Sequence, residues 1–265
     1  MKATVFLGGG RITSALLSGL RLAKFRGPIM VHDRHRDKLQ ELECEHNLIA
    51  EPNLPRAVDA ARLLIIAVRP DSVRDLLQKI ATLKLRRPLI AVSLAAGVPL
   101  SRLREELRSP VRWARAMPSP VARSGRGLTA LAFSRDLPSS ARREVRKLFS
   151  LVGAVVEIPE EQFDAFTVTF SSSHGYHALA GLIAAAEAVG LDSKIARLAA
   201  THALADGILA WREGDDTLDE LVQEAATPGG TAAAVMNAMN KAGYRKILRE
   251  GLRAGVKRAR KNAKR

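Results

Sequence analysis

The sequence predicts an α/β protein in which a doubly wound, mostly parallel sheet is followed by an all-helical second domain. Two observations support this: apolar runs alternate with amphipathic stretches over the first 159 residues, and the strand pattern stops from residue 160 onward. Short continuous apolar runs indicate strands buried on both faces, and their alternation with helices indicates βαβ units. We therefore expect two domains, residues 1–159 and residues 160–265.

The elements of the first domain follow one another in a regular order. The expected strands are 3–8, 29–33, 63–68, 89–94, 111–117, 127–133 and 154–158. The expected helices between them are 12–24, 36–46, 71–83 and 139–150. The sheet should therefore contain seven or eight strands and end near Pro159.

The second domain is rich in alanine and is expected to be helical throughout. Asp192 or Ser193 is expected to cap a helix that ends before Gly214. Thr217 and Glu220 have the spacing of a capping box, which predicts a further helix start. Small side chains let helices approach closely, which suits a compact bundle or a subunit interface.

The composition is that of an ordinary globular protein, with 47% hydrophobic residues. No apolar run approaches the roughly 20 residues of a membrane span, and the N-terminus lacks the apolar stretch of a signal segment. The single cysteine, Cys44, cannot form a disulfide within the chain, which indicates a reducing compartment. We therefore expect a cytoplasmic protein without membrane contact.

The net charge of +15 is concentrated at the C-terminus. Residues 241–265 hold eleven Lys or Arg against one Glu, so only a third of the excess lies elsewhere. This pattern predicts a solvated basic helix end that frays. Because no aromatic residue lies among the charges of residues 249–265, bases would have nothing to stack on there, and we do not expect nucleic-acid binding.

A glycine-rich turn separates the first strand from the first helix. The strand is followed by Gly8, Gly9 and Gly10, and the helix then begins with Arg11 and Ile12. Glycines at this place permit a tight turn and let the backbone approach a pyrophosphate at the helix N-terminus. The third position of the dinucleotide fingerprint holds a threonine, so the motif is incomplete, but its strand-turn-helix context predicts dinucleotide binding.

The end of the second strand bears on the choice of dinucleotide. Asp33 can accept hydrogen bonds from the ribose of NAD, whereas the adjacent Arg34, His35 and Arg36 suit the 2′-phosphate of NADP. Both cofactors remain open, and the basic cluster favours NADP. A solvated helix start is the structural alternative for these cations.

Five motifs in order resemble the pyrroline-5-carboxylate reductase family. They are "GGGRIT" (8–13), "AVRP" (67–70), "SLAAGV" (93–98), "RAMPSP" (115–120) and "TPGGTA" (227–232). The resemblance runs over nearly the whole chain. It implies a Rossmann domain followed by a helical domain that dimerises, with the active site between the domains and across the homodimer.

The resemblance also implies a reaction and a set of cofactor-binding residues. A hydride passes from the nicotinamide to the imine carbon of a cyclic imino acid, with no metal, and no metal-ligand spacing is present in the sequence. The expected cofactor-binding residues are Gly8, Gly9, Gly10, Arg11, Ile12, Asp33, Arg34, His35, Val68, Arg69, Pro70, Ala95, Ala96, Gly97, Met117 and Ser119.

The expected substrate segments depart from the family pattern. "SSSHGY" (171–176) replaces G-S-G-P-A-Y, which forms a kink in the first long helix of the second domain, so His174 replaces a proline. His174 is either a proton donor or cation near a carboxylate, or a hydrogen-bonded residue at that kink. In "TPGGTA", Ala232 stands where the family has a second threonine. The expected catalytic residues are His174 and Thr231, and the expected substrate-binding residues are Ser172, Ser173, Tyr176, Thr227, Gly229, Gly230 and Ala232.

The Pro228-Gly229-Gly230 stretch is expected to end one helix and begin another at Thr231. A bare backbone at a helix N-terminus would bind a substrate carboxylate, as phosphates are bound elsewhere, although a simple helix corner is the plainer interpretation. The leading hypothesis is an NAD(P)H-dependent reductase of pyrroline-5-carboxylate. The alternatives are a reductase of another imine or carbonyl compound, and a nucleotide-binding dimer that has lost catalysis.

Overall fold

The computed structural model describes residues 2–83, 85 and 87–262. The chain divides into two compact units, of which the first comprises Met1–Phe170 with Gly255–Arg265 and the second comprises Ser171–Ala254. The division expected after residue 159 therefore falls inside the first unit. The last three residues of the basic tail, 263–265, lie outside the described residues.

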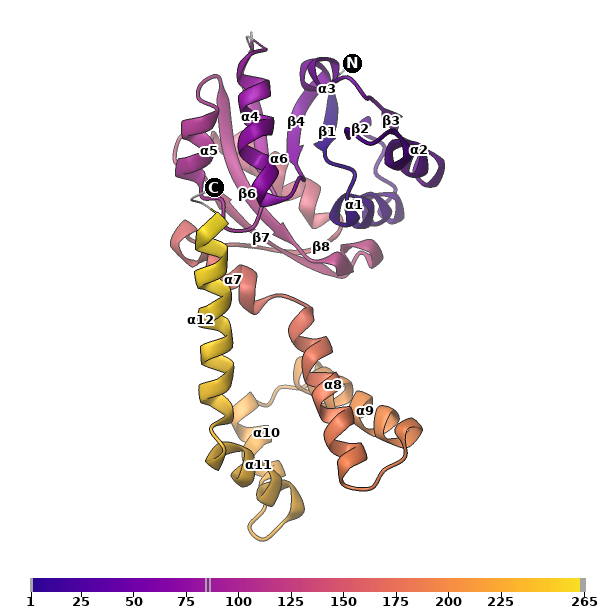
Figure 1. The fold of residues 1–265 in the computed structure, drawn as a ribbon, viewed down its shortest axis with the longest axis vertical. Helices are drawn as coiled ribbons and strands as arrows, with labels where there is room; N and C mark the ends of the chain where they lie inside the picture. The colour runs from indigo at the N-terminus through magenta and orange to yellow at the C-terminus, as the bar shows by residue number, and fades with distance from the viewer. Residues whose placement is uncertain (1, 84, 86, 263–265) are drawn as a thin grey trace. The chain divides into compact units, whose positions relative to one another are not determined.

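Among the described residues, the first unit contains a sheet of eight strands (Figure 1). Their order is β3-β2-β1-β4-β5-β6-β7-β8, and the neighbouring strands are parallel except for β6 and β7. The strands are Ala3–Leu7 (β1), Ile29–His32 (β2), Ile49–Ala50 (β3), Ala61–Ile66 (β4), Leu89–Ser93 (β5), Val111–Pro118 (β6), Gly127–Phe133 (β7) and Gly153–Glu157 (β8). The doubly wound, mostly parallel sheet predicted from the sequence is confirmed.

Helices cover both faces of this sheet, with α1, α2 and α6 packed on one face and α3, α4 and α5 on the other. They are Arg11–Leu22 (α1), Arg36–Glu45 (α2), Leu54–Ala60 (α3), Val73–Ala81 (α4), Leu100–Glu106 (α5) and Ser139–Ser150 (α6). Successive strand residues enter opposite cores: Leu64 and Ile66 pack on the α3–α5 side, and Leu63 and Ile65 on the other. This alternation explains the continuous apolar runs, because both faces of each strand are buried.

The sequence does not predict β3, α3 or α5. β3 has two residues and the two helices have seven each, which is too short for a clear apolar period. Local signals do mark α3: the Asn53 side chain accepts a hydrogen bond from the Arg56 amide at 3.0 Å, and Pro55 lies in the first turn. The eighth strand arises from the β3 segment.

A buried arginine on β6 connects the sheet to the end of the first unit. The Arg115 side chain is 2% exposed, and its Nη1 donates to Glu160 Oε1 at 3.0 Å. Its Nη2 lies 3.5 Å from Asp164 Oδ1, and its guanidinium lies 4.0 Å from the centre of the Phe163 ring. Because two carboxylates and an aromatic face surround one buried cation, helix α7 (Phe163–Thr169) stays with the sheet.

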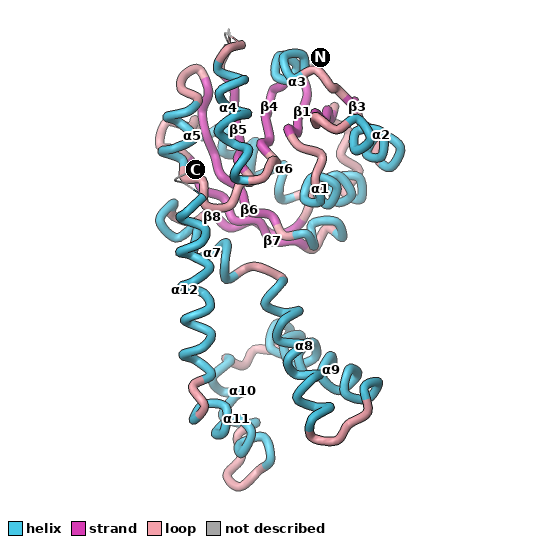
Figure 2. Tube along the Cα trace, viewed as in Figure 1, coloured by secondary structure: helices cyan, strands magenta, loops and turns pink. Residues whose placement is uncertain are grey.

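The second unit is helical in its described residues (Figure 2). Its helices are Ser173–Ala188 (α8), Ser193–Glu213 (α9), Leu218–Ala225 (α10) and Thr231–Lys241 (α11), and α12 (Tyr244–Asn262) begins in the second unit and ends in the first. No described helix is both long and apolar enough to cross a membrane.

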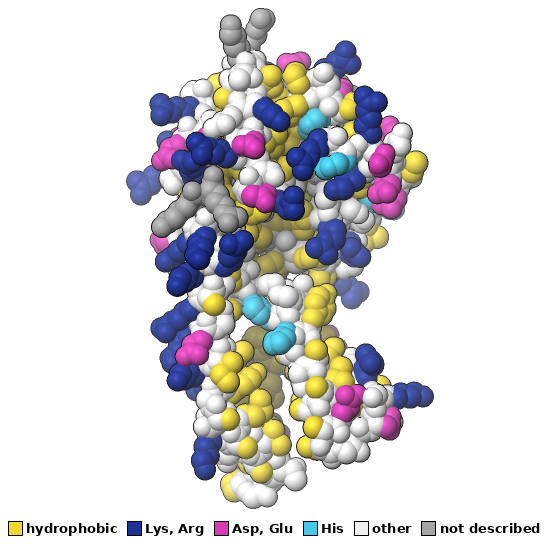
Figure 3. Space-filling view, viewed as in Figure 1, with side chains coloured by type: hydrophobic (Ala, Val, Ile, Leu, Met, Phe, Trp, Pro, Cys, Tyr) yellow, Lys and Arg dark blue, Asp and Glu magenta, His cyan; other side chains and the backbone are white. Residues whose placement is uncertain are grey.

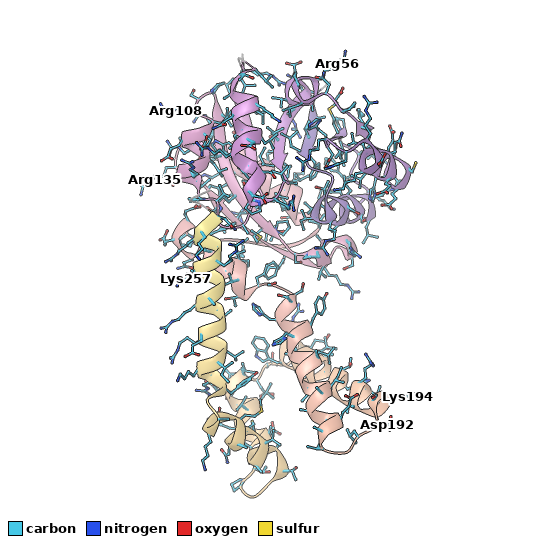
Figure 4. All side chains as sticks on the ribbon, viewed as in Figure 1. Arg56, Arg108, Arg135, Asp192, Lys194 and Lys257 are labelled. Atoms are coloured by element: carbon cyan, nitrogen blue, oxygen red, sulfur yellow. The ribbon has the colours of Figure 1, made fainter. Side chains whose placement is uncertain are left out.

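Two predicted helix caps are present in the second unit. Asp192 Oδ1 accepts hydrogen bonds from the Lys194 and Ile195 amides at 3.0 and 3.1 Å at the start of α9 (Figure 4). Thr217 and Glu220 form the reciprocal bonds of a capping box before α10. The local chemistry of these helix starts therefore fixes where each helix begins.

Large apolar side chains of the second unit lie on its surface (Figure 3). Helices α8 and α10 bury no residue, and α9 buries only Ala196 and Ala200. The exposed apolar residues include Tyr176, Leu182, Val189, Leu191, Ile195, Leu198, Ile208, Leu209, Trp211, Val235 and Ile247. Monomeric proteins rarely expose so many apolar side chains on one compact region, so a second chain is expected to cover them.

The basic C-terminal segment is not a frayed end within the described residues. Helix α12 is continuous to Asn262, and Ala259 near its end is only 7% exposed. The basic residues of its last turns, such as Lys257, are exposed to solvent (Figure 4), whereas Gly255 and Ala259 contact Val168 and Gly97 of the same unit. The prediction that this end frays is therefore wrong as far as Asn262, because one face of the helix is small enough to pack, whereas the predicted solvation of its cations is confirmed.

Candidate functional site

Several loops lie together at one edge of the first unit's sheet. The register pairs Leu7 with His32 and Ile66, and Ile66 with Ser93, so the carboxyl ends of β1, β2, β4 and β5 are neighbours. Ligands of open α/β sheets bind at this edge, where the strand order reverses. The expected cofactor residues follow these strands as Gly8–Ile12, Asp33–His35, Val68–Pro70 and Ala95–Gly97, and Met117 and Ser119 lie at the end of parallel β6.

The first glycine of the turn is required by the protein itself, and the second is closely packed. Gly8 has φ of +113°, and a Cβ there would lie 2.6 Å from the Ala67 carbonyl oxygen. A Cβ at Gly9 would lie 3.0 Å from the Leu42 side chain. Backbone conformation and the nearby Ala67 carbonyl therefore require glycine at position 8, whereas a side chain at position 9 would need only the flexible Leu42 side chain to shift.

Gly10 has no such reason within the protein. It has φ of −81°, a value open to any residue, and no protein atom lies within 4 Å of the position that its Cβ would take. Gly10 is the N-cap of α1, where no side chain makes a capping hydrogen bond. A bare residue facing open space before a twelve-residue helix is the arrangement that lets a phosphate approach the first amides of the helix.

Thr13 takes the place of the fingerprint's third small residue without opening the turn. Its side chain is fully buried, and its hydroxyl donates to the Gly8 carbonyl oxygen at 2.6 Å. The hydroxyl thus ties the helix to the turn that precedes it. The incomplete motif is therefore compatible with a closed, ordered glycine turn.

Asp33 is held by the turn on both oxygens. Oδ2 accepts from the Gly9 amide at 2.7 Å, while Oδ1 accepts from the His35 amide and lies 2.9 Å from the His35 ring. Burial raises the pKa of Asp33, but the hydrogen bonds from Gly9 and His35 outweigh it and the net pKa is lowered. Arg34, His35 and Arg36 are exposed beside this carboxylate.

The remaining expected cofactor residues fall into two groups. The side chains of Ile12, Val68 and Met117 pack against the cores, so only their backbones or edges are open to a ligand. Ala95, Gly97 and Ser119 are also buried, whereas Arg11 and Arg69 are exposed. The edge thus combines bare backbone with exposed cations, which suits an anionic nucleotide.

In the second unit, Ser171–Tyr176 leads into helix α8 and forms its first turn. The Ser171 and Ser173 hydroxyl oxygens lie 2.6 Å apart, and the exposed His174 donates its amide to the Ser171 carbonyl at 3.0 Å. Gly175 has no protein atom within 4 Å of its would-be Cβ, although glycine costs a helix about 1 kcal/mol relative to alanine. Tyr176 is 70% exposed. This helix start presents polar groups around an open position.

The Thr227–Gly230 stretch forms a tight turn before α11. Gly229 has φ of +78°, and the Gly230 amide donates to the Thr227 carbonyl at 2.9 Å, as in a turn with proline second and glycine third. Gly230 is the N-cap, and helix α11 begins at Thr231 without a side-chain cap. The helix break predicted at Pro228 is confirmed, and the exposed Thr231 and Ala232 lie in the first turn of an eleven-residue helix.

No group of three or more His, Cys, Asp or Glu side chains within the described part of the chain has an arrangement that could hold a metal ion.

Comparisons with known proteins cover both parts of the chain. Residues 160–262 match the family model for pyrroline-5-carboxylate reductase dimerisation, and residues 4–97 match the model described as NADP oxidoreductase coenzyme F420-dependent. Pyrroline-5-carboxylate reductases of Mycobacterium leprae and of a Synechocystis strain are each 29% identical, over 96% of this chain and 94% and 95% of their own lengths. Over nearly its whole length the chain is therefore similar to pyrroline-5-carboxylate reductases.

The fold agrees with this similarity. The solved structure of pyrroline carboxylate reductase from Plasmodium falciparum, with NADP bound, has a TM-score of 0.85 to this chain and 18% identity, with 98% of each chain covered. The chain thus combines an N-terminal part that matches the NADP oxidoreductase model with a C-terminal part that matches the pyrroline-5-carboxylate reductase dimerisation model. That dimerisation model begins at residue 160, whereas the compact second unit begins at Ser171.

Sequence reasoning missed three residues that support this edge of the sheet and the segments beside it. Thr13 was visible only as a fault in the fingerprint, and Arg115 lies in the "RAMPSP" motif without a role being assigned. Asn262 lies in the basic tail, and its side chain hydrogen-bonds to the Ala96 carbonyl at 3.1 Å. A charged residue at a buried strand position marked Arg115, but no sequence signal marked Asn262.

Proposed function

We propose that this chain is an NAD(P)H-dependent reductase of a cyclic imino acid, with pyrroline-5-carboxylate as substrate and proline as product. The observation that carries the proposal is Gly10, whose missing side chain faces open space at the N-terminus of α1, while Gly8 is explained by its backbone conformation and packing. When bound, the reduced nicotinamide supplies the hydride that reduces the C=N bond. The residues of the chain bind, orient and protonate the substrate.

NADP is the cofactor that the Asp33 region favours. Both carboxylate oxygens of Asp33 are already bonded to Gly9 and His35, so few acceptor sites remain for a free ribose 2′-hydroxyl. Arg34 and Arg36 are exposed beside it and can pair with a 2′-phosphate. Replacing both arginines by alanine should weaken NADPH binding and leave NADH binding unchanged. Equal losses for both nucleotides would remove this assignment.

The turn before α11 is the proposed site of the substrate carboxylate. The first amides of a helix carry partial positive charge, and α11 starts without a side chain bonded to them. Gly229 and Gly230 keep the approach free of side chains, Ala232 contributes its amide, and Thr227 and Thr231 offer hydroxyls. These features support carboxylate binding by the same physics that places phosphates at other helix starts.

His174 is the proposed proton donor to the imine nitrogen. A protonated imine accepts hydride far more readily than a neutral one, and imidazole titrates near neutral pH. His174 lies in the first turn of α8 beside Ser172, Ser173 and Tyr176, the proposed lining residues. Thr231 is the second proposed catalytic residue, through its hydroxyl at the start of α11.

A homodimer formed through the helical unit completes the proposal. The exposed apolar residues of α8 and α9 need a cover that this chain alone does not supply. Helical Gly181 and Gly207 have no neighbours within 4 Å of a would-be Cβ, so their bareness favours close approach by another helix. Together these features fit the family's dimerisation model over residues 160–262.

We also propose a cytoplasmic location. Cys44 is a free cysteine exposed on α2. An exposed thiol without an intramolecular partner suits a reducing compartment. Fractionation of cells that produce the protein would test this directly.

Hydride transfer to the proposed substrate can be followed by isotope. The protein is incubated with pyrroline-5-carboxylate and NADPH carrying two deuterium atoms at C4 of the nicotinamide, and the product is analysed by mass spectrometry and NMR. The proposal predicts proline with one deuterium at C5, the former imine carbon. Unlabelled proline would exclude direct transfer. Absence of product with intact NADPH binding would indicate another imine or carbonyl substrate, or a chain that has lost catalysis.

A further inference from the structure

The end of helix α12 contacts one of the expected cofactor loops. The loop Ala95–Gly97 follows β5, and residues 255–262 of α12 belong to the same compact unit as that loop. Gly255 lies against α7, where a Cβ would be 3.1 Å from the Val168 side chain. The end of α12 thus packs against α7 at Gly255 and, further along, against the loop Ala95–Gly97.

Gly97 shows how close this contact is. It has φ of +75°, and a Cβ there would overlap the backbone carbonyl of Ala259. Ala259 itself is buried. The two backbones therefore touch directly, which requires glycine at 97.

Asn262 adds a specific bond to this contact. Its Nδ2 donates to the Ala96 carbonyl oxygen at 3.1 Å, across 166 positions of sequence. The same side chain lines a narrow crevice with Pro70, Val73 and Val98. Pro70 ends a second expected cofactor segment, "AVRP", so Asn262 bonds to one expected cofactor loop and shares a crevice with a residue of another.

Peptide geometry gives this bond a consequence for the loop. The Ala96 carbonyl and the Gly97 amide share one planar peptide unit, in which C=O and N–H point in opposite directions. Holding the carbonyl toward α12 therefore directs the Gly97 N–H away from α12. Among the described residues, no hydrogen-bond acceptor is paired with that N–H. A directed backbone donor at this edge is available to an oxygen of the nucleotide.

We propose that Asn262 is a positioning residue for cofactor binding, which fixes the peptide between Ala96 and Gly97 so that the Gly97 amide can donate to the nucleotide. The proposal rests on the proposed function, because it takes the 95–97 loop as part of the cofactor site. The basic C-terminal helix accordingly acts in nucleotide binding through one uncharged side chain near its end. Its exposed cations have no part in this role.

The test compares Asn262→Ala with Asn47→Ala in the full-length protein. Asn47 is exposed in the first unit, and no hydrogen bond of its side chain exists among the described residues, so it is a chemically matched control. NADPH affinity is measured by fluorescence titration, thermal stability by calorimetry, and KM for NADPH and for the imino acid by steady-state kinetics. The loss of one hydrogen bond should weaken NADPH binding about three- to tenfold, with Tm and the KM of the imino acid unchanged. Asn47→Ala should match wild type.

A third variant separates the hydrogen bond from packing. Asn262→Gln keeps an amide donor and should recover most of the affinity that Asn262→Ala loses. Hydrogen exchange of the peptide spanning 93–98 should be faster in Asn262→Ala than in wild type before NADPH is added. Wild-type affinity in Asn262→Ala, or equal losses in the Ala and Gln variants, would overturn the proposal. A wild-type protein that binds no NADPH would instead overturn the proposed function.

Discussion

Alanine substitutions at Gly8 and Gly10 should affect different properties of the protein, although the two residues are only two positions apart in one turn. At Gly8, a side chain must adopt φ of +113° and come within 2.6 Å of the Ala67 carbonyl oxygen. At Gly10, φ is −81° and the added methyl group meets no protein atom. Gly8→Ala should therefore reduce stability, and Gly10→Ala should reduce nucleotide binding.

The sizes of the two effects follow from the structure. For Gly8→Ala, a left-handed backbone conformation costs about 1–3 kcal/mol and overpacking adds about 1–3 kcal/mol. A chain of this size loses roughly 2–4 °C of Tm per kcal/mol, so Tm should fall by roughly 5 °C or more. For Gly10→Ala, the change from glycine to alanine at an N-cap costs at most about 1 kcal/mol. A methyl group between the backbone and the pyrophosphate should weaken NADPH binding by at least about tenfold, or 1.4 kcal/mol.

Calorimetry of the nucleotide-free proteins and fluorescence titration with NADPH measure both effects on the same samples. Gly10→Ala should keep a Tm within a few degrees of wild type and lose affinity. Gly8→Ala should show a lowered Tm, and its affinity is compared at a temperature where it is folded. Wild-type NADPH affinity in Gly10→Ala would refute the assignment of this turn as the pyrophosphate site.

Three further predictions concern other parts of the chain. His174→Ala should lower kcat, and wild-type rates at every pH would exclude His174 as the proton donor. The pKa of Asp33 is lowered in the folded protein, so the stability that its carboxylate contributes is present above the unfolded pKa of about 3.9 and is lost as pH falls through the lower folded pKa. The Tm difference between wild type and Asp33→Asn should therefore be constant from pH 5 to 7 and vanish only below about pH 4. Leu198→Glu, at an exposed apolar position of α9, should shift the protein toward monomer in sedimentation equilibrium. Arg197→Glu, at the neighbouring position, should shift it less. An unchanged mass for Leu198→Glu would place the interface elsewhere.

The parts of the fold that the sequence predicts are those with a repeated local signal. β4 and β5 are continuous apolar runs because helices cover both faces of the sheet, and Asp192 and Thr217 mark helix starts by side-chain chemistry. β3 lacks such a signal, because two residues contain no period. The C-terminal helix was misjudged for a different reason: composition reports its charges, while packing depends on Gly255 and Ala259 on another face.

The candidate site shows the same limit. The glycine turn and Asp33 are close in sequence to recognisable strands, so parallel topology brings them together in a predictable way. Asn262 reaches Ala96 from 166 positions away, and such a contact depends on how the whole chain folds. The different roles of Gly8 and Gly10 are also visible only in the structure, because the sequence does not reveal which glycine faces open space.

The most direct measurement mixes the purified protein with NADPH and pyrroline-5-carboxylate and follows the absorbance of the reduced nicotinamide. The account predicts rapid loss of absorbance that depends on both protein and imino acid, with an equal amount of proline formed. No loss above the rate without protein, in a sample shown by titration to bind NADPH, would contradict the claim that this chain reduces pyrroline-5-carboxylate.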